Sequence, residues 1–195
     1  MNVKTIQLRT QLCLALSLFS LTGWVSGQEQ KEVASASAAA LEREKAMKNP
    51  YPNDFGPDHV DVSKYSPELQ AGYKLMIEKC SKCHSASRVL NSQFIDLKED
   101  EIAKLKNDQM DILKNKQIWQ VESGIWQRYV KRMMSKPGCN ISPDEGKRIW
   151  KFVVEDSKIR KTGPATESWR SHRKKLLADF QDKHPDKYKE LFGEK

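Results

Sequence analysis

The feature that most constrains this chain is the run Cys80-Ser81-Lys82-Cys83-His84, a C-x-x-C-H pattern in which two thiols are followed by an imidazole. This pattern is the attachment motif of a c-type haem. Within one helical turn the two thiols can reach the two vinyl groups of a single porphyrin, while the adjacent imidazole lies under the iron. The motif predicts one covalently bound haem c per chain, with Cys80 and Cys83 as thioether links and His84 as proximal axial ligand.

Other uses of the cysteine pair have to be weighed against a haem. A thioredoxin-like C-x-x-C occurs in a βαβ setting, and no strand pattern accompanies this one. A zinc site needs a second pair of ligands, but Cys139 stands alone and His59, His172 and His184 are not at zinc spacing. The plain structural alternative is a disulfide or free thiols. Cys139 itself is open to three interpretations: a buried small hydrophobe, an intermolecular disulfide or a reactive thiol.

The first 27 residues have the pattern of a secretory signal peptide. Lys4 and Arg9 precede an apolar run from Leu12 to Val25, which ends in small residues. This run is shorter than the roughly 18 residues expected of a membrane span, and Cys13 lies inside it rather than at the cleavage point. We therefore expect an exported, periplasmic protein. Its formal net charge of +8 becomes +6 without this segment, and nucleic acid is not the expected partner of an exported chain.

A flexible segment and then a helix are expected before the motif. Residues 28–57 are rich in Ala, Ser, Glu and Lys without apolar periodicity, which predicts a flexible N-terminal segment. Ser66, Pro67 and Glu68 then supply a helix cap, a first-turn proline and an early acid. The helix that follows has apolar positions spaced by four and three residues, at Leu69, Tyr73, Met76, Cys80 and Cys83.

Further helices are expected after the motif. One would span about 96–112 within an insertion at 93–125. Another would span 119–135, with Trp126, Val130 and Met133 on one face. A capping box at residues 142–145 opens the next helix, whose inner face would hold Ile149, Trp150 and Val153. No strand pattern appears, so we expect an all-α fold.

A last helical stretch is expected in the C-terminal extension, residues 162–195. Its apolar positions are Trp169, Leu176, Leu177 and Phe180, on a basic background. Residues 158–195 contain eleven Lys or Arg against six Asp or Glu, so most of the excess charge lies here. Clustered positive charge of this kind can steer association with an acidic partner or a membrane surface. The alternative is a solvated helix face that serves solubility.

The second axial ligand is a separate question. Met133 is the first choice, because it follows Trp126 and Val130 on an apolar face and precedes a Pro-Gly turn. Its neighbour Met134 is the alternative. Without the motif, both methionines would be interpreted as adaptable core residues. The poorer candidates are Met76, Met110, His172 and His184.

Several segments together resemble small bacterial single-haem cytochromes c related to class I. The resemblance covers about residues 61–161. Its marks are Asp61-Val62-Ser63-Lys64-Tyr65, the haem motif, Arg88 with Asn91-Ser92, the segment from Trp126 to Met133, Lys136-Pro137-Gly138, Ile141-Ser142 and Asp156-Ser157 with Arg160-Lys161. The resemblance implies a cytochrome c-like helical domain over 58–161, with Met133 as distal ligand. The insertion at 93–125 and the C-terminal extension depart from the compact pattern.

The expected function is periplasmic electron transfer rather than enzymatic catalysis. A six-coordinate haem would carry one electron between redox protein partners. The alternative is a haem with an open distal site, acting as a small-molecule sensor or a peroxidase-like enzyme. No distal His and Arg pair is evident in the sequence, although folding could bring His59 and Arg88 together.

Overall fold

The computed structural model describes residues 27–94 and 123–193 of the chain. Within these ranges the chain is helical and contains no strand, which confirms the predicted all-α class. None of the described helices is long and apolar enough to cross a bilayer. By its internal contacts the chain divides into two compact units, residues 1–34 and 35–195. The described part of the first unit, residues 27–34, is helical, and the core and the site lie in the second.

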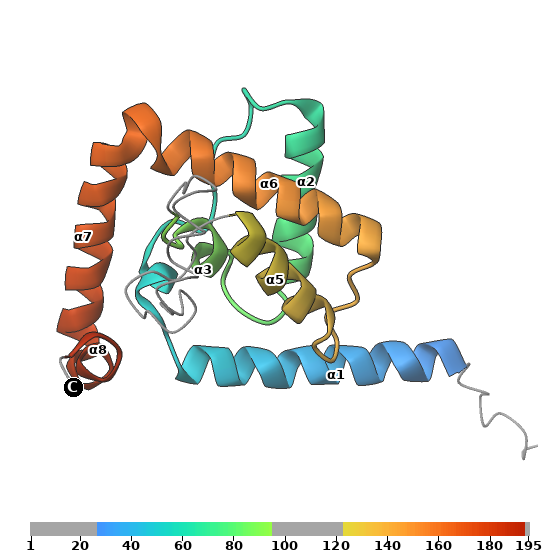
Figure 1. The fold of residues 1–195 in the computed structure, drawn as a ribbon. Helices are drawn as coiled ribbons and strands as arrows, with labels where there is room; N and C mark the ends of the chain where they lie inside the picture. The colour runs from blue at the N-terminus through green and yellow to red at the C-terminus, as the bar shows by residue number, and fades with distance from the viewer. Residues whose placement is uncertain (1–26, 95–122, 194–195) are drawn as a thin grey trace, which may run out of the picture. The chain divides into compact units, whose positions relative to one another are not determined.

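Figure 1 shows the described elements in chain order. Their bounds are α1 (Gly27–Lys48), the 3₁₀ turn η1 (Pro52–Phe55), α2 (Pro67–Cys80), α3 (Ala86–Leu90), α5 (Ser123–Met134), α6 (Pro143–Lys161), the 3₁₀ turn η2 (Gly163–Ala165), α7 (Thr166–Lys183) and α8 (Pro185–Phe192). The helix predicted at 96–112 lies outside the described residues. The helix predicted at 119–135 is described from Ser123 onward, as α5.

The centre of the fold is the crossing of α2 and α6, which make the most extensive contact between elements (Figure 1). Both helices start as their cap sequences predict. Ser66 Oγ accepts the Leu69 N–H at the start of α2, and a complete capping box opens α6. The helices approach so closely at Gly72 that a Cβ there would lie 2.7 Å from the Arg148 carbonyl oxygen. The glycine is what allows the two backbones to meet.

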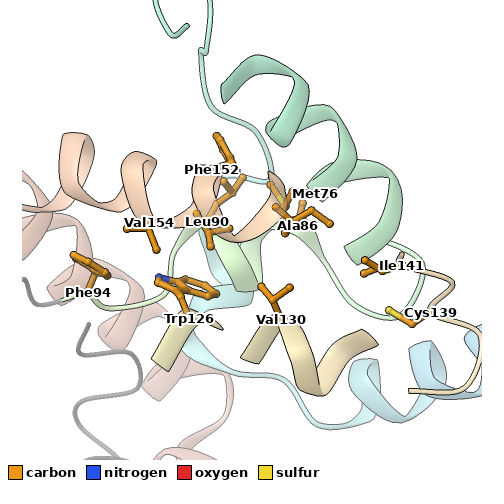
Figure 2. Packing of buried hydrophobic residues seen from close by; sticks show 12 residues of the cluster. Met76, Ala86, Leu90, Phe94, Trp126, Val130, Cys139, Ile141, Phe152 and Val154 are labelled. Carbon is orange, nitrogen blue, oxygen red and sulfur yellow. The ribbon is translucent and has the colours of Figure 1, made fainter. Parts of the chain in front are cut away.

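The core lies around this crossing and extends under α3 and α5 (Figure 2). Met76 and Phe152 are fully buried at its centre. Trp126 and Val130 enter from α5, as the sequence pattern predicts. The other buried members are Ala86, Leu90, Phe94, Cys139, Ile141, Ile149, Val153 and Val154.

The segment predicted to be flexible is largely helical, since α1 reaches Lys48 and η1 follows at Pro52. Alanine-rich sequence has high helix propensity, and pairs such as Glu44 and Lys48, 2.6 Å apart, add local support. The second half of α1 is also held by tertiary contacts. Asn140 donates to Ser35 Oγ at 2.7 Å, an interaction between residues far apart in sequence. Apolar periodicity missed this helix because Ala39 is the one buried apolar residue among its described positions.

The C-terminal extension forms two helices rather than one. A break at His184 separates α7 from α8, because Pro185 starts a new helix. Three of the predicted apolar positions of α7, Trp169, Leu176 and Phe180, are buried. The helix packs against η1 and the end of α6, so it is part of the folded unit.

Candidate functional site

A cavity of about 480 Å³ opens where α1, α2, α3, α5 and the loop after α5 come together. Cofactor and ligand sites usually have about 300–1,000 Å³. Its lining includes all four residues that were predicted from the sequence to hold the haem: Cys80, Cys83, His84 and Met133. The remaining lining residues are Glu42, Lys45, Ala46, Asn49, Tyr51, Asn53, Lys79, Arg88, Val89, Ser92, Trp126, Tyr129, Arg132, Lys136 and Cys139.

The two motif cysteines lie where α2 ends. Helix α2 stops at Cys80, and the N–H groups of Cys83 and His84 both donate to the Cys80 carbonyl, each at 3.4 Å. This tight turn keeps both thiols on the cavity wall, although Cys83 lies beyond the helix rather than on its buried face. Burial raises the pKa of the Cys80 thiol to about 12, so at neutral pH it is protonated. Both thiols are free.

The His84 imidazole is held in one orientation by a backbone carbonyl. Its Nδ1 lies 2.9 Å from the Ser85 carbonyl oxygen. A carbonyl can only accept, so Nδ1 carries the proton and Nε2 keeps its lone pair. Burial lowers the pKa of His84 below its usual value, which favours the neutral ring. A neutral imidazole with a fixed tautomer is the form that binds a metal.

The two methionines at the end of α5 face different surroundings. Met133 lines the cavity. The Met134 sulfur instead packs on α6, where it would lie 2.6 Å from a Cβ built on Gly146. A helix turns the side chains of adjacent residues about 100° apart, so only one of them can point at the cavity. The structure brings Met133 and His84 to the same cavity, and it places Met134 elsewhere.

Trp126 is buried in the core and also reaches the cavity (Figure 2). Its indole N–H has no hydrogen-bond partner among the described residues. A buried donor without an acceptor costs about 1–3 kcal/mol, so this N–H is a candidate donor to a group outside the described residues. Trp169 makes a useful contrast, since its N–H donates to Gln93 Oε1 at 3.1 Å.

The charge of the cavity wall is mainly positive. Five of the lining residues are basic, and Glu42 is the one acid among them. The acid is compensated locally, because hydrogen bonds from Lys45 and Lys136 lower the Glu42 pKa. Lys79 and Arg88 are also paired, with Glu145 and Asp54, so the positive excess that a ligand with anionic groups would meet is smaller than the number of basic residues. The basic residues are Lys45, Lys79, Arg88, Arg132 and Lys136.

These properties fit a haem. Two thiols and a neutral imidazole are provided on one wall and a thioether sulfur on another. The basic residues of the wall, Arg132 among them, suit the two propionate groups. Cys80 and Cys83 could hold the group covalently, with His84 and Met133 as axial ligands.

Sequence reasoning missed the part of the wall that α1 provides. Glu42, Lys45, Ala46 and Asn49 line the cavity, although they lie in the segment predicted to be flexible. Cys139 was left open by the sequence. The structure places it in the cavity wall as a free thiol that is 5% exposed, which agrees with the buried small hydrophobe among its three interpretations.

Three of the weaker ligand candidates, those among the described residues, do not line the cavity. Met76 is buried in the core, His172 contacts Asn91 Oδ1, and His184 packs on aromatic rings. Met110 lies outside the described residues. His59 and Arg88 are not brought together as a distal pair, because His59 contacts Asp58 while Arg88 is paired with Asp54.

Comparisons of this chain with protein families, with curated proteins and with solved structures find no match.

Proposed function

We propose that this protein is a periplasmic single-haem c-type cytochrome that transfers one electron at a time between redox proteins. The supporting observation is that Cys80, Cys83, His84 and Met133 line one cavity. The methionine is about fifty residues from the motif in sequence, so nothing local requires the two to meet. The resemblance of residues 61–161 to small bacterial cytochromes c agrees with this proposal.

When bound, the haem iron supplies reversible exchange between the ferric and ferrous states. The residues of this chain would hold and tune it. Cys80 and Cys83 would prevent its loss through thioether links, and His84 would donate from Nε2 because Nδ1–H is bound to Ser85. Met133 would be the second axial ligand, and a thioether ligand favours the ferrous state. Trp126 would donate to a propionate, and the apolar core beside it would help to exclude water.

The alternative of an open distal site has less support. It requires a distal side without a protein ligand, whereas Met133 lines the cavity and His59 is exposed beside Asp58. We propose other redox proteins as the partners of this protein. A basic surface can also steer an acidic partner or a membrane surface toward the tail, in a way that salt weakens.

The proposal is tested by expressing the chain in a host that matures c-type cytochromes. Denaturing electrophoresis with haem staining should give a stained band, because thioether links survive denaturation. The double variant Cys80→Ser, Cys83→Ser is the matched control and should give no stain. Equal staining of the two proteins, or no stain in the wild type, would contradict the proposal.

Spectra of the stained protein then separate the carrier from the open-site alternative. A six-coordinate centre should show a Met–iron charge-transfer band in the ferric state and should resist carbon monoxide in the ferrous state. Rapid carbon monoxide binding by the wild type would favour a sensor or a peroxidase-like enzyme.

A further inference from the structure

We propose that Asp54, outside the haem motif, is a positioning residue for the His84 imidazole, acting through Ser85. This inference rests on the proposed haem site and adds to it the residue that sets how well His84 donates to the iron. Asp54 lies in η1, thirty residues before His84, so neither spacing nor periodicity points to it.

Ser85 makes four hydrogen bonds. Its carbonyl oxygen accepts from His84 Nδ1 at 2.9 Å and from the Arg88 N–H at 3.3 Å. Its hydroxyl donates to Asp54 Oδ1 at 2.5 Å and accepts the Arg88 N–H at 3.3 Å as the cap of α3. The orientation of the imidazole therefore depends on a residue whose own side chain is fixed by Asp54.

Asp54 is itself fixed. Arg88 binds both oxygens of its carboxylate, with Nε at 3.0 and 3.2 Å and Nη2 at 2.6 Å. The Tyr51 N–H donates to it at 2.9 Å. Burial alone would raise the pKa of Asp54, but hydrogen bonds from Arg88 and Ser85 outweigh it and the pKa is lowered. A paired, ionised carboxylate is a rigid acceptor for the Ser85 hydroxyl.

Arg88 extends this support to the end of α1. Its Nη2 donates to the carbonyl oxygens of Ala46 and Asn49, at 3.2 and 3.4 Å. Its guanidinium also lies over the Tyr51 ring, 4.8 Å from the centroid. Asp54 and Arg88 are 15% and 21% exposed, so the pair is shielded from solvent and from screening by salt.

The arrangement has an effect on the metal as well as on the fold. A fixed acceptor on Nδ1–H makes an imidazole a stronger donor at Nε2. A stronger donor stabilises ferric iron more than ferrous iron. Loosening Asp54 should therefore weaken the His84 donation and move the equilibrium toward the ferrous state. A residue that only joined α1 to α3 would change stability without changing this equilibrium.

The test is the ferric–ferrous equilibrium of the haem-loaded Asp54→Asn protein, measured against a redox mediator. Removing a partner of a metal ligand commonly changes site properties by about 10–100-fold. We expect a change of about tenfold toward the ferrous state, which equals about 59 mV for one electron. Asp58→Asn is the matched control. Asp58 lies four residues after Asp54, and its exposed carboxylate contacts His59 instead of Ser85. This variant should leave the equilibrium unchanged.

If Asp54→Asn binds too little haem for the measurement, two further variants still test the inference. Ser85→Ala keeps the carbonyl but removes the hydroxyl, so it should shift the equilibrium in the same direction. Asp54→Glu should restore part of the wild-type value. An unchanged equilibrium in Asp54→Asn or Ser85→Ala, with haem fully attached, would overturn the role of Asp54. A wild type without haem stain would overturn the proposed function instead.

Discussion

At the scale of single residues, the methionine pair at the end of α5 shows how one position separates two roles. Met133 lines the cavity, while the Met134 sulfur fills the space beside Gly146 on α6. The same side-chain chemistry therefore serves a candidate ligand and a packing contact. Their difference arises from the rotation of about 100° between adjacent helical residues.

We expect Met133→Ala to lose the Met–iron charge-transfer band and to gain carbon monoxide binding, because the distal position becomes accessible. The reduction potential should also fall when the thioether is removed. Absorption spectra of both oxidation states check this. Met134→Leu is the control, since it keeps the packing volume against α6 and should be nearly native. Loss of the band in Met134→Leu alone would identify the neighbour as the ligand.

Trp126 allows a second test at this scale. We expect Trp126→Phe to keep the haem but to lose a hydrogen bond to a charged acceptor, which contributes about 1.5–3 kcal/mol. Resonance Raman spectra should show a shifted propionate bending mode, and chemical denaturation gives the free energy of unfolding. Trp169→Phe is the control, because that indole donates to Gln93 within the protein. An identical propionate mode in wild type and Trp126→Phe would refute this role of the indole.

At the scale of elements, the α2–α6 crossing depends on the absence of a side chain at Gly72. A Cβ there would lie 2.7 Å from the Arg148 carbonyl oxygen and 2.8 Å from Phe152 Cβ. Both contacts involve atoms near the α6 backbone, so the helices would have to separate.

We expect Gly72→Ala to lower the free energy of unfolding by about 1–3 kcal/mol, the usual cost of overpacking. Helix propensity alone predicts the opposite sign, a gain of about 1 kcal/mol. Denaturant titration measures the change. Ala71→Gly, at an exposed position of the same helix, isolates the propensity effect. Stabilisation by Gly72→Ala would show that the crossing tolerates a side chain.

The cap of α6 gives a prediction about pH. Glu145 accepts the Ser142 N–H at 2.8 Å and lies 3.0 Å from Lys79 Nζ. The backbone hydrogen bond and then Lys79 lower its pKa from 4.5 to about 2. A carboxylate with a lowered pKa in the folded state stabilises the fold above its unfolded pKa. This contribution is lost as pH falls from about 4.5 toward about 2.

We therefore expect Glu145→Gln to be less stable than wild type at neutral pH, with the difference disappearing near pH 2. Denaturant titrations across this range give the comparison. Glu155→Gln is the control on the same helix, since its carboxylate lies 3.6 Å from Lys158 and takes no part in the cap. A constant difference at all pH values would exclude ionisation of Glu145 as the cause.

At the scale of the whole molecule, basic side chains of the C-terminal region, residues 158–195, bind the end of α3, the helix that follows the haem motif. Three consecutive carbonyls at the C-terminal end of α3 each accept from a basic side chain of α6 or α7. Arg160 donates to Leu90, Arg173 to Asn91 and Lys161 to Ser92, all at 2.9 Å. Basic groups are favourable at the C-terminal end of a helix. Part of the charge of this region is therefore structural.

We expect Arg173→Ala to lower the free energy of unfolding by about 1.5–3 kcal/mol, because it leaves buried acceptors without a charged donor. Arg173 also donates to Asn53 Oδ1 at 2.6 Å. Thermal or chemical unfolding checks this, with the exposed neighbour Lys174→Ala as control. Equal stability of the two variants would show that the hydrogen bonds of Arg173 do not stabilise the fold.

The sequence predicts what depends on neighbouring residues. The Ser66 and Ser142 caps and the buried face of α5 follow from local patterns. The choice of Met133 rests on the apolar face of its own helix and on the resemblance, whereas its meeting with the motif in one cavity is a tertiary feature. Interactions between distant residues do not follow from local patterns. Asp54 and Arg88 are 34 positions apart, and an inward-pointing arginine such as Arg173 has the same sequence pattern as a solvated one. Helix α1 was missed for the same reason, because tertiary contacts support it.

The contacts that hold α1 against the cavity are expected to form late in folding. Ser35 is synthesised 105 residues before its partner Asn140, and Glu42 is 94 residues before Lys136. Contacts so distant in sequence form slowly, since a long loop must close first. The turn after α2 needs only its own neighbours. During this interval the turn of the motif is formed while α1 does not yet cover it, so the proposed haem would be attached before α1 encloses the cavity.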